Sequence, residues 1–219
     1  MNWIDIEQNT PEWLECRSGL FTSSNIFNLF VKGKGDKLSK SAETYITQKA
    51  IEQIYPVQAE TFGSKAMQWG NEHEDNARTV YEVVTGNEVS NGGFYRFDDN
   101  TGSSPDGLVG TDGMIEIKCP YVRINHINNV LNLKDDTDLY KYSKQYYYQV
   151  HHQMFCSGRS WVDFCSFDPR LLSSKNFLHI IRIERNEELM DRMAEVIYQA
   201  GKERDRIINE FQNIKHSIF

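Results

Sequence analysis

Two carboxylates and a lysine stand near the middle of the chain, in a pattern that suits metal-assisted hydrolysis. Asp106 follows a Ser-Ser-Pro run, and Glu116-Ile117-Lys118 begins ten residues later. Carboxylate oxygens are the ligands that Mg²⁺ prefers, and a lysine can orient or stabilise the water that attacks a phosphodiester. The spacing therefore predicts a nuclease. The same short motif also fits a surface hairpin whose polar face is solvated.

A hairpin would bring these groups together. Its strands are expected at 102–109 and 114–119, joined by a turn at 110–113. Since side chains alternate between the two faces of a strand, Ser104 and Asp106 would share one face. Glu116 and Lys118 would also share a face, with the neighbouring isoleucines directed to the core. The hairpin would thus form one wall of a site.

A further acidic side chain falls on the buried face of a helix expected over residues 65–84. Ala77 and Tyr81 follow helical spacing on the apolar stripe, and Glu74 lies on the same stripe. An inward carboxylate is costly unless it is paired or binds a metal. Glu74 is therefore either a residue of the metal site or the partner of Arg78, one turn further on.

The helix expected over residues 139–156 has two distinct faces. One is apolar and predicts core packing. The other carries aromatic and amide side chains at helical spacing, namely Tyr142, Tyr146, Gln149 and Gln153. Such a face can hold a lysine and a phosphate through neutral hydrogen bonds, although a helix facing solvent would show the same pattern.

Near the N-terminus, Arg17 and Ser24 stand seven residues apart with Gly19 between them. An arginine beside a hydroxyl group at a helix N-terminus can bind a phosphate. The simpler interpretations are a surface arginine and an ordinary N-cap serine.

The charge of the chain is uneven. Its net charge of −7 over 219 residues by itself argues against a DNA partner. Residues 17–40, however, carry five basic side chains against Asp36 alone, so this segment could follow DNA or form a solvated loop. A nuclease needs a local positive track and a negative metal cage, and an acidic average is compatible with both.

The remaining composition points to an ordinary intracellular protein. No apolar run approaches the length of a membrane span, and the N-terminus lacks a signal pattern, so we expect a cytosolic protein. The four cysteines form no C-x-x-C pair and are expected to be reduced, packed thiols. The six histidines show no metal-binding spacing.

The order of elements predicts an α/β (α+β) fold with a central mixed β-sheet flanked by helices. We expect one domain, with N-terminal helices over 10–55, a core over about 65–183 and a C-terminal helix over about 186–213. Within it, a helix capped by residues 23–25 should run to Phe30, another should cover 41–55, and further strands should lie at 93–97, 160–167 and 177–183.

Five blocks of the sequence together resemble the phage lambda-type exonuclease family, the YqaJ-like viral recombinase nucleases. The blocks are residues 13–24, 69–78, 104–108, 116–120 and 146–150. They occur in the family's order with compatible spacing, and the resemblance extends from about Trp13 to Ile183. It implies a restriction-endonuclease-like PD-(D/E)XK core.

The resemblance also implies roles for matching positions. The implied metal ligands are Asp106, Glu116 and the backbone carbonyl of Ile117, and both carboxylates count as catalytic. The other implied catalytic residues are Lys118, Glu74 and Gln149, with Tyr146 in support. The implied ligands of a 5′-terminal phosphate are Arg17, Ser24 and Ser104. The implied DNA contacts are Lys65, an apolar wedge at Met67, and a basic loop that holds Lys32, Lys34 and Lys37.

By this resemblance the protein would be a Mg²⁺-dependent 5′→3′ exonuclease, with Mn²⁺ able to substitute. It would degrade one strand of double-stranded DNA to 5′-mononucleotides and leave 3′ tails for a single-strand annealing protein. The resemblance further implies a homotrimeric ring around DNA, and a phage or prophage protein in the cytoplasm of a bacterial host. The alternatives are a repair or restriction endonuclease with the same core, and an inactive nuclease-like subunit that only binds DNA.

Overall fold

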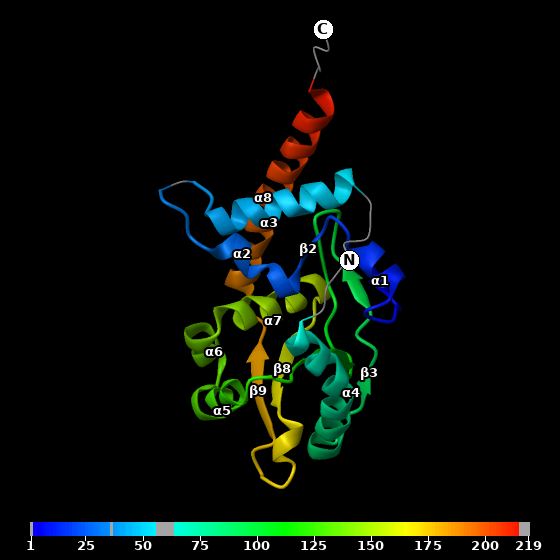
Figure 1. Ribbon diagram of the computed structural model, residues 1–219, viewed down its shortest axis with the longest axis vertical. Coiled ribbons are helices and arrows are strands. Elements are labelled where there is room, and N and C mark those ends of the chain that lie inside the picture. Colours follow the sequence, from blue (N-terminus) through cyan, green and yellow to red (C-terminus); the bar gives the residue numbers. More distant parts are fainter. Residues whose placement is uncertain (1, 36, 56–63, 215–219) are drawn as a thin grey trace.

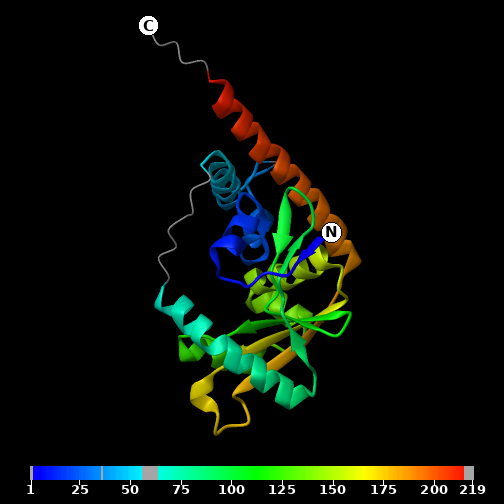
Figure 2. The same ribbon diagram turned by 90° about the vertical axis from the view of Figure 1, so that its right-hand side faces the viewer.

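The structure is a computed structural model that describes residues 2–35, 37–55 and 64–214. Figures 1 and 2 show the N-terminal helices and a small sheet beside α8 (Glu187–Asn213) in one half of the molecule. A larger sheet with α4 (Lys65–Thr85) and α5 (Arg123–Asn132) forms the other half. Helix α7 (Lys144–Ser157) lies between the halves and contacts strands of both sheets.

Two mixed sheets form the frame, which confirms the predicted mixed α/β class. The larger sheet has the order β3-β6-β7-β8-β9, and the smaller has the order β1-β4-β5-β2. The larger sheet consists of Val89–Ser90, Gly107–Val109, Gly113–Lys118, Trp161–Phe167 and Leu178–Glu184 in that order. The smaller consists of Asn2–Ile4, Phe94–Arg96, Thr101–Ser103 and Phe21–Thr22. Strands β7 and β8 run parallel, whereas β6 and β7 run antiparallel.

The single strand expected over residues 102–109 is wrong, because two strands in different sheets occupy this range. Strand β5 ends at Ser103, and β6 begins at Gly107. Pro105 lies between them and has no backbone N–H to donate to a strand ladder. The chain therefore leaves one sheet and enters the other here. Asp106 lies at this crossing, so strand alternation does not set its direction.

The remaining helices are short except for α3. They are α1 (Pro11–Arg17), α2 (Phe27–Phe30), α3 (Lys40–Ile54) and α6 (Asp136–Tyr142), with 3₁₀ turns η1 (Ser23–Asn25) and η2 (Pro169–Leu171). The predicted N-cap of α1 is confirmed, since the Thr10 hydroxyl accepts from the backbone N–H of Trp13 at 3.3 Å. The predicted cap over residues 23–25 is wrong, because these residues themselves form η1 and no side chain caps α2.

The helix expected over residues 139–156 is interrupted at Ser143, whose backbone angles (φ −149°, ψ 72°) are not helical. The N–H of Ser143 donates to the Leu139 carbonyl, and the Ser143 carbonyl accepts from the N–H of Tyr147. Serine favours such positions because its side chain competes with helical backbone bonds. The residue therefore ends α6 and begins α7. Residues 136–138, which precede the expected start of this helix, belong to α6.

Strand β7 lies between two apolar clusters. Met114 belongs to the larger cluster, together with residues of α7 and β8 such as Val150 and Phe164. Ile115 and Ile117 belong to a second cluster with Ala77 and Tyr81 of α4. The expectation that these two isoleucines point to the core is confirmed, and the side chains between them face α7. Both faces of β7 are buried, which excludes the alternative of a solvated surface hairpin.

A buried arginine attaches α8 to the N-terminal region. Arg204 is 3 % exposed, and its guanidinium donates to the carbonyls of Gly19 and Asp99 and to the side chain of Asn100. The C-terminal helix thus holds the turn after α1 in place. No described helix is both long and apolar enough to cross a membrane. The four cysteines are free, as predicted.

Candidate active site

Asp106 is fixed at both its backbone and its side chain. Its carboxylate accepts from the backbone N–H of Ile117 on β7 at 2.6 Å. Its carbonyl accepts from the guanidinium of Arg78 on α4 at 2.7 Å. Burial and the nearby charges of Glu116 and Glu74 raise the pKa of Asp106 well above its usual range. The crossing between the sheets thus delivers this carboxylate to the end of β7.

Glu116 is 1 % exposed, and three side chains hold its carboxylate. Gln149 donates to Oε1 at 2.5 Å, and Gln153 donates to Oε2 at 2.5 Å. Lys118, two residues along the same strand, also donates to Oε1. A buried carboxylate is costly without such partners. Helix α7 therefore determines where Glu116 points.

Lys118 ends β7 with its side chain 22 % exposed and its ammonium group 5.3 Å from the centre of the Tyr146 ring. Burial disfavours the charged form, but the carboxylates of Glu116 and Asp106 outweigh burial and raise the pKa of Lys118. The lysine therefore reaches solvent as an ammonium group with a carboxylate on one side.

Glu74 lies on α4 across from β7 and is not fully satisfied by Arg78. The two side chains are 3.7 Å apart, which is too long for a hydrogen bond, and Arg78 instead donates to the carbonyl of Asp106. Burial and the charge of Glu116 raise the pKa of Glu74. The structure thus brings Glu74 to the same site as Asp106, where the charge of Glu74 contributes to the raised pKa of Asp106.

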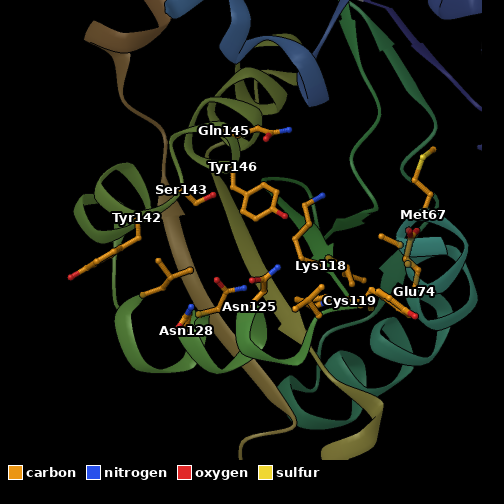
Figure 3. Close-up of a pocket in the computed structure, with 18 of the residues that line it drawn as sticks. Met67, Glu74, Lys118, Cys119, Asn125, Asn128, Tyr142, Ser143, Gln145 and Tyr146 are labelled. Carbon is orange, nitrogen blue, oxygen red and sulfur yellow. The ribbon is translucent and has the colours of Figure 1, made fainter. Parts of the chain in front are cut away.

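A pocket of about 830 Å³ opens beside these groups. Figure 3 shows Glu74 and Met67 of α4 on one side, Lys118 of β7 in the middle, and residues of α5 and α7 on the other. Lys118 and Glu74 are the charged residues among its described lining. The acid–lysine group therefore faces a space large enough for a ligand.

The residues fit a divalent cation, although no three Asp, Glu, His or Cys side chains in the described ranges form a complete metal site. An ionised carboxylate offers about four lone-pair positions, and Glu116 uses three of them. Asp106 uses one oxygen for Ile117. The carbonyl of Ile117 points the same way as its N–H, toward Asp106, where the β6 ladder has already ended at Ile115. Two carboxylates and one carbonyl supply the oxygen donors that Mg²⁺ prefers.

Arg17 and Ser104, predicted as phosphate ligands, are joined through Trp13. The Arg17 guanidinium stacks 3.7 Å from the centre of the Trp13 ring, and the indole N–H donates to the Ser104 hydroxyl at 2.8 Å. Among the described residues Arg17 has no ion pair or hydrogen bond from its side chain. Burial lowers the pKa of Arg17 to about 10, against the opposing effect of Tyr45 and Glu52. Such a group is prepared to receive an anion.

The structure does not bring the other predicted DNA contacts together. The Ser24 carbonyl accepts from Gln145 at 3.3 Å, but no described hydrogen bond links Ser24 to Arg17 or Ser104. Met67 is 54 % exposed and lines the pocket. The remaining predicted contacts are exposed lysines, namely Lys65 at the start of α4 and Lys32, Lys34 and Lys37 in the loop between α2 and α3.

Sequence reasoning omitted Gln153 and His152 from the site residues. Gln153 lies one helical turn after Gln149 on the same stripe, so the spacing already pointed to it. His152 is fully buried; its ring nitrogens lie 2.8 Å from the hydroxyl groups of Ser23 and Thr101. No sequence pattern indicated this link. It ties α7, which holds Glu116, to the N-terminal region around Arg17.

Comparisons with known proteins agree with this arrangement. Residues 12–160 match the model of the YqaJ-like viral recombinase domain. The chain is similar to an alkaline exonuclease (LHK-Exo) from Laribacter hongkongensis, with 31% sequence identity, a TM-score of 0.81, and coverage of 93% of this chain and 96% of that one. That relative has also been crystallised in complex with dAMP.

A phage-related exonuclease from Haemophilus somnus 129PT has the same fold, with 21% identity, a TM-score of 0.70 and coverage of 88% and 96%. The comparison with curated proteins found no match. The family match covers well over half of the chain, and the Laribacter relative aligns along nearly all of it. The chain belongs to the YqaJ-like viral recombinase family.

Proposed function

We propose that this protein is a Mg²⁺-dependent deoxyribonuclease that degrades one strand of double-stranded DNA from its 5′ end. The observation that carries the proposal is the convergence of Asp106, Glu116 and Lys118 at the end of β7, where Lys118 lines a pocket together with Glu74. Family membership and the exonuclease relatives support the same reaction class. Mn²⁺ would serve in place of Mg²⁺, since both accept oxygen ligands.

Asp106, Glu116 and the Ile117 carbonyl would hold the metal. When bound, Mg²⁺ supplies Lewis-acid polarisation of the phosphate and activation of water. Lys118 points into the pocket and, as an ammonium group, would orient the attacking water. Glu74 stands on the opposite wall and would accept a hydrogen bond from the same water.

The glutamines of α7 have a supporting role. Gln149 and Gln153 hold one carboxylate oxygen of Glu116 each, so the group cannot rotate freely. Outer groups of this kind orient metal ligands and tune their affinity. Tyr146 lies beside Lys118 and would restrict the ammonium group to the pocket side.

The region around Arg17 supports the direction of attack. Arg17 stacks on the Trp13 ring, the indole N–H of Trp13 donates to the Ser104 hydroxyl, and Ser104 is two residues from Asp106. A terminal 5′-phosphate bound there would place the first internucleotide bond near the carboxylates. The enzyme would then release 5′-mononucleotides and leave 3′ tails. Ser24, Met67 and the lysines of the loop after α2 would contact DNA further along.

We assign the whole chain to one nuclease domain with a PD-(D/E)XK core. Its partners would be DNA ends, two further copies in a homotrimeric ring, and a single-strand annealing protein in the cytoplasm of a bacterial host. An endonuclease of the same core is the main alternative. The Arg17 region argues against it, because internal cleavage needs no terminal phosphate. An inactive DNA-binding subunit would not need the full set of Glu74, Asp106, Glu116 and Lys118.

One experiment tests the proposal directly. Linear duplex DNA labelled at its 5′ or 3′ ends and closed circular DNA are incubated with the protein and Mg²⁺, and the products are identified. We expect 5′-mononucleotides from linear DNA, early loss of the 5′ label, and intact circles. Cleavage of circles would support the endonuclease, and early loss of the 3′ label would reverse the polarity. Asp106→Ala is the control for a contaminating nuclease.

A further inference from the structure

The pocket beside Lys118 has two chemically different ends. The charged end is formed by Lys118 and Glu74. The opposite end is neutral and rich in amides, with α5 contributing Asn125, Asn128, Asn129 and Asn132. These four asparagines have helical i, i+3, i+4, i+7 spacing, so they form one continuous face. Figure 3 shows Asn125 and Asn128 reaching from α5 into the same space as Tyr146 and Lys118.

Two of these asparagines are free to bind a ligand. Asn129 donates to the Ser166 hydroxyl and Asn132 donates to the Asn128 carbonyl, so both serve the fold. The side-chain amides of Asn125 and Asn128 make no hydrogen bond to the described chain, and both residues are exposed. Tyr121 and Tyr142 also line the pocket, and they are 46 % and 51 % exposed.

The residues that line this pocket suit the binding of a nucleobase better than the binding of a phosphate backbone. A surface that follows a phosphate backbone relies on several lysines and arginines. Among the described residues that line this pocket, Lys118 alone is basic. Amides both donate and accept hydrogen bonds, and exposed tyrosine rings offer flat surfaces for stacking. A nucleotide has the same division into a charged phosphate and a neutral, flat base.

We infer that the amide face of α5, through Asn125 and Asn128, binds the base of the nucleotide whose phosphate lies at the Lys118 end. The ligand class is a 2′-deoxynucleoside 5′-monophosphate unit, namely the nucleotide on the 3′ side of the scissile bond, which becomes the new 5′ end of the strand after cleavage. This inference rests on the proposed function, because it uses the cleavage site to place the phosphate. Because an amide can match donors and acceptors, all four bases should bind with affinities within about threefold of one another.

The test measures binding rather than cleavage, by calorimetric titration of the full chain with and without Mg²⁺. The probes are dAMP, the other three deoxynucleoside monophosphates, 2-deoxyribose 5-phosphate and inorganic phosphate. We expect dAMP to bind at least tenfold more tightly than deoxyribose phosphate. Asn125→Ala and Asn128→Ala should each weaken dAMP about fivefold, as expected for one hydrogen bond, and leave inorganic phosphate unchanged. Asn125→Asp should weaken dAMP binding further than Asn125→Ala, because its carboxylate cannot donate and its negative charge repels the phosphate.

Asn76→Ala is the matched control, since Asn76 is an exposed helical asparagine outside the pocket lining. Saturation-transfer NMR on the wild type provides a readout without any variant, and it should show stronger transfer to the base protons than to the sugar protons. Any of three results would overturn the inference. These are equal binding of dAMP and deoxyribose phosphate, no binding of dAMP, and equal dAMP affinities in the α5 and control variants. If DNA is still cleaved in that case, the proposed nuclease stands and only the base site is wrong. If no DNA is cleaved but dAMP binding depends on α5, the nuclease proposal fails and the base site survives.

Discussion

Replacing Arg17 by methionine should stabilise the protein and remove its preference for a 5′-phosphate. Burial lowers the pKa of Arg17 from its usual value to about 10. Neutral pH lies below both values, so the guanidinium is charged in the folded and unfolded states and the full cost of burying it is present. At about 1.4 kcal/mol for each pKa unit, this cost is about 3 kcal/mol.

The Arg17→Met substitution should raise the free energy of unfolding by less than this cost. The substitution removes the stacking on Trp13, worth about 1 kcal/mol, while the methionine retains most of the stem packing. Partial solvent access reduces the remainder, so we expect the free energy of unfolding to rise by about 1 kcal/mol, or 2–4 °C in Tm for a chain of this size. Thermal and urea unfolding without DNA measure this change.

The functional effect has the opposite sign. A hydrogen bond to a charged group contributes about 1.5–3 kcal/mol, so wild type should favour 5′-phosphorylated over 5′-hydroxyl duplex ends by roughly 10- to 150-fold in kcat/KM. Arg17→Met should bring this ratio close to one. Arg96→Met is the matched control, because Arg96 is exposed and its ion pair with Asp99 is a surface pair worth little. A destabilised Arg17→Met variant that keeps the phosphate preference would refute both the burial argument and the proposed pocket.

Further predictions concern the carboxylate site and α7. Asp106→Ala should abolish cleavage but retain binding of DNA ends in a mobility-shift assay, and substantial turnover would remove the metal site. Lys118→Ala should lower kcat more than tenfold with Mg²⁺ affinity nearly unchanged, and a smaller loss would leave the lysine a structural role. Gln153→Leu should weaken Mg²⁺ binding 10- to 100-fold in calorimetric titration, because it releases one oxygen of Glu116; unchanged affinity would contradict the orienting role. Burial lowers the pKa of His152 to about 3, so as the pH falls below about 6.5 this histidine is protonated in the unfolded chain before it is protonated in the folded protein. The free energy of unfolding should therefore drop by about 2 kcal/mol between pH 7 and 5. If a His152→Gln variant shows the same drop, another group causes the pH dependence.

The main helices and strands, and some local details within them, could be predicted from the local sequence. The cap at Thr10 and the two faces of β7 follow from short-range rules that packing did not override. The break between β5 and β6 was also present in the sequence as Pro105, whose missing donor is incompatible with a continuous central strand. The prediction failed there because it assumed that side chains keep alternating between the two faces of one strand across Pro105.

The site itself depends on contacts between distant residues. Local rules could place Glu116 and Lys118 on the strand face opposite the core-facing isoleucines, but they could not identify Gln149 and Gln153, more than thirty residues away, as partners of Glu116. Similarly, Arg17 and Ser104 are linked only because Trp13 spans from α1 to the crossing between the sheets. Such pairings are set by how helices pack on sheets, which periodicity in one segment does not encode.

By itself, the sequence determined the chemical inventory of this protein: the carboxylates, the lysine, the amide stripe of α7 and the family to which they belong. It did so because residue types and helical or strand periods are local properties of the chain. The tertiary structure decided which of these groups share a site and what each one contacts. It buried Glu116 against α7, separated Asp106 from the strand expected to carry it, left Arg17 without a described ionic partner, and placed the amides of α5 opposite Lys118. These outcomes follow from burial and long-range packing, whose free energies exist only once the two sheets and their helices have come together.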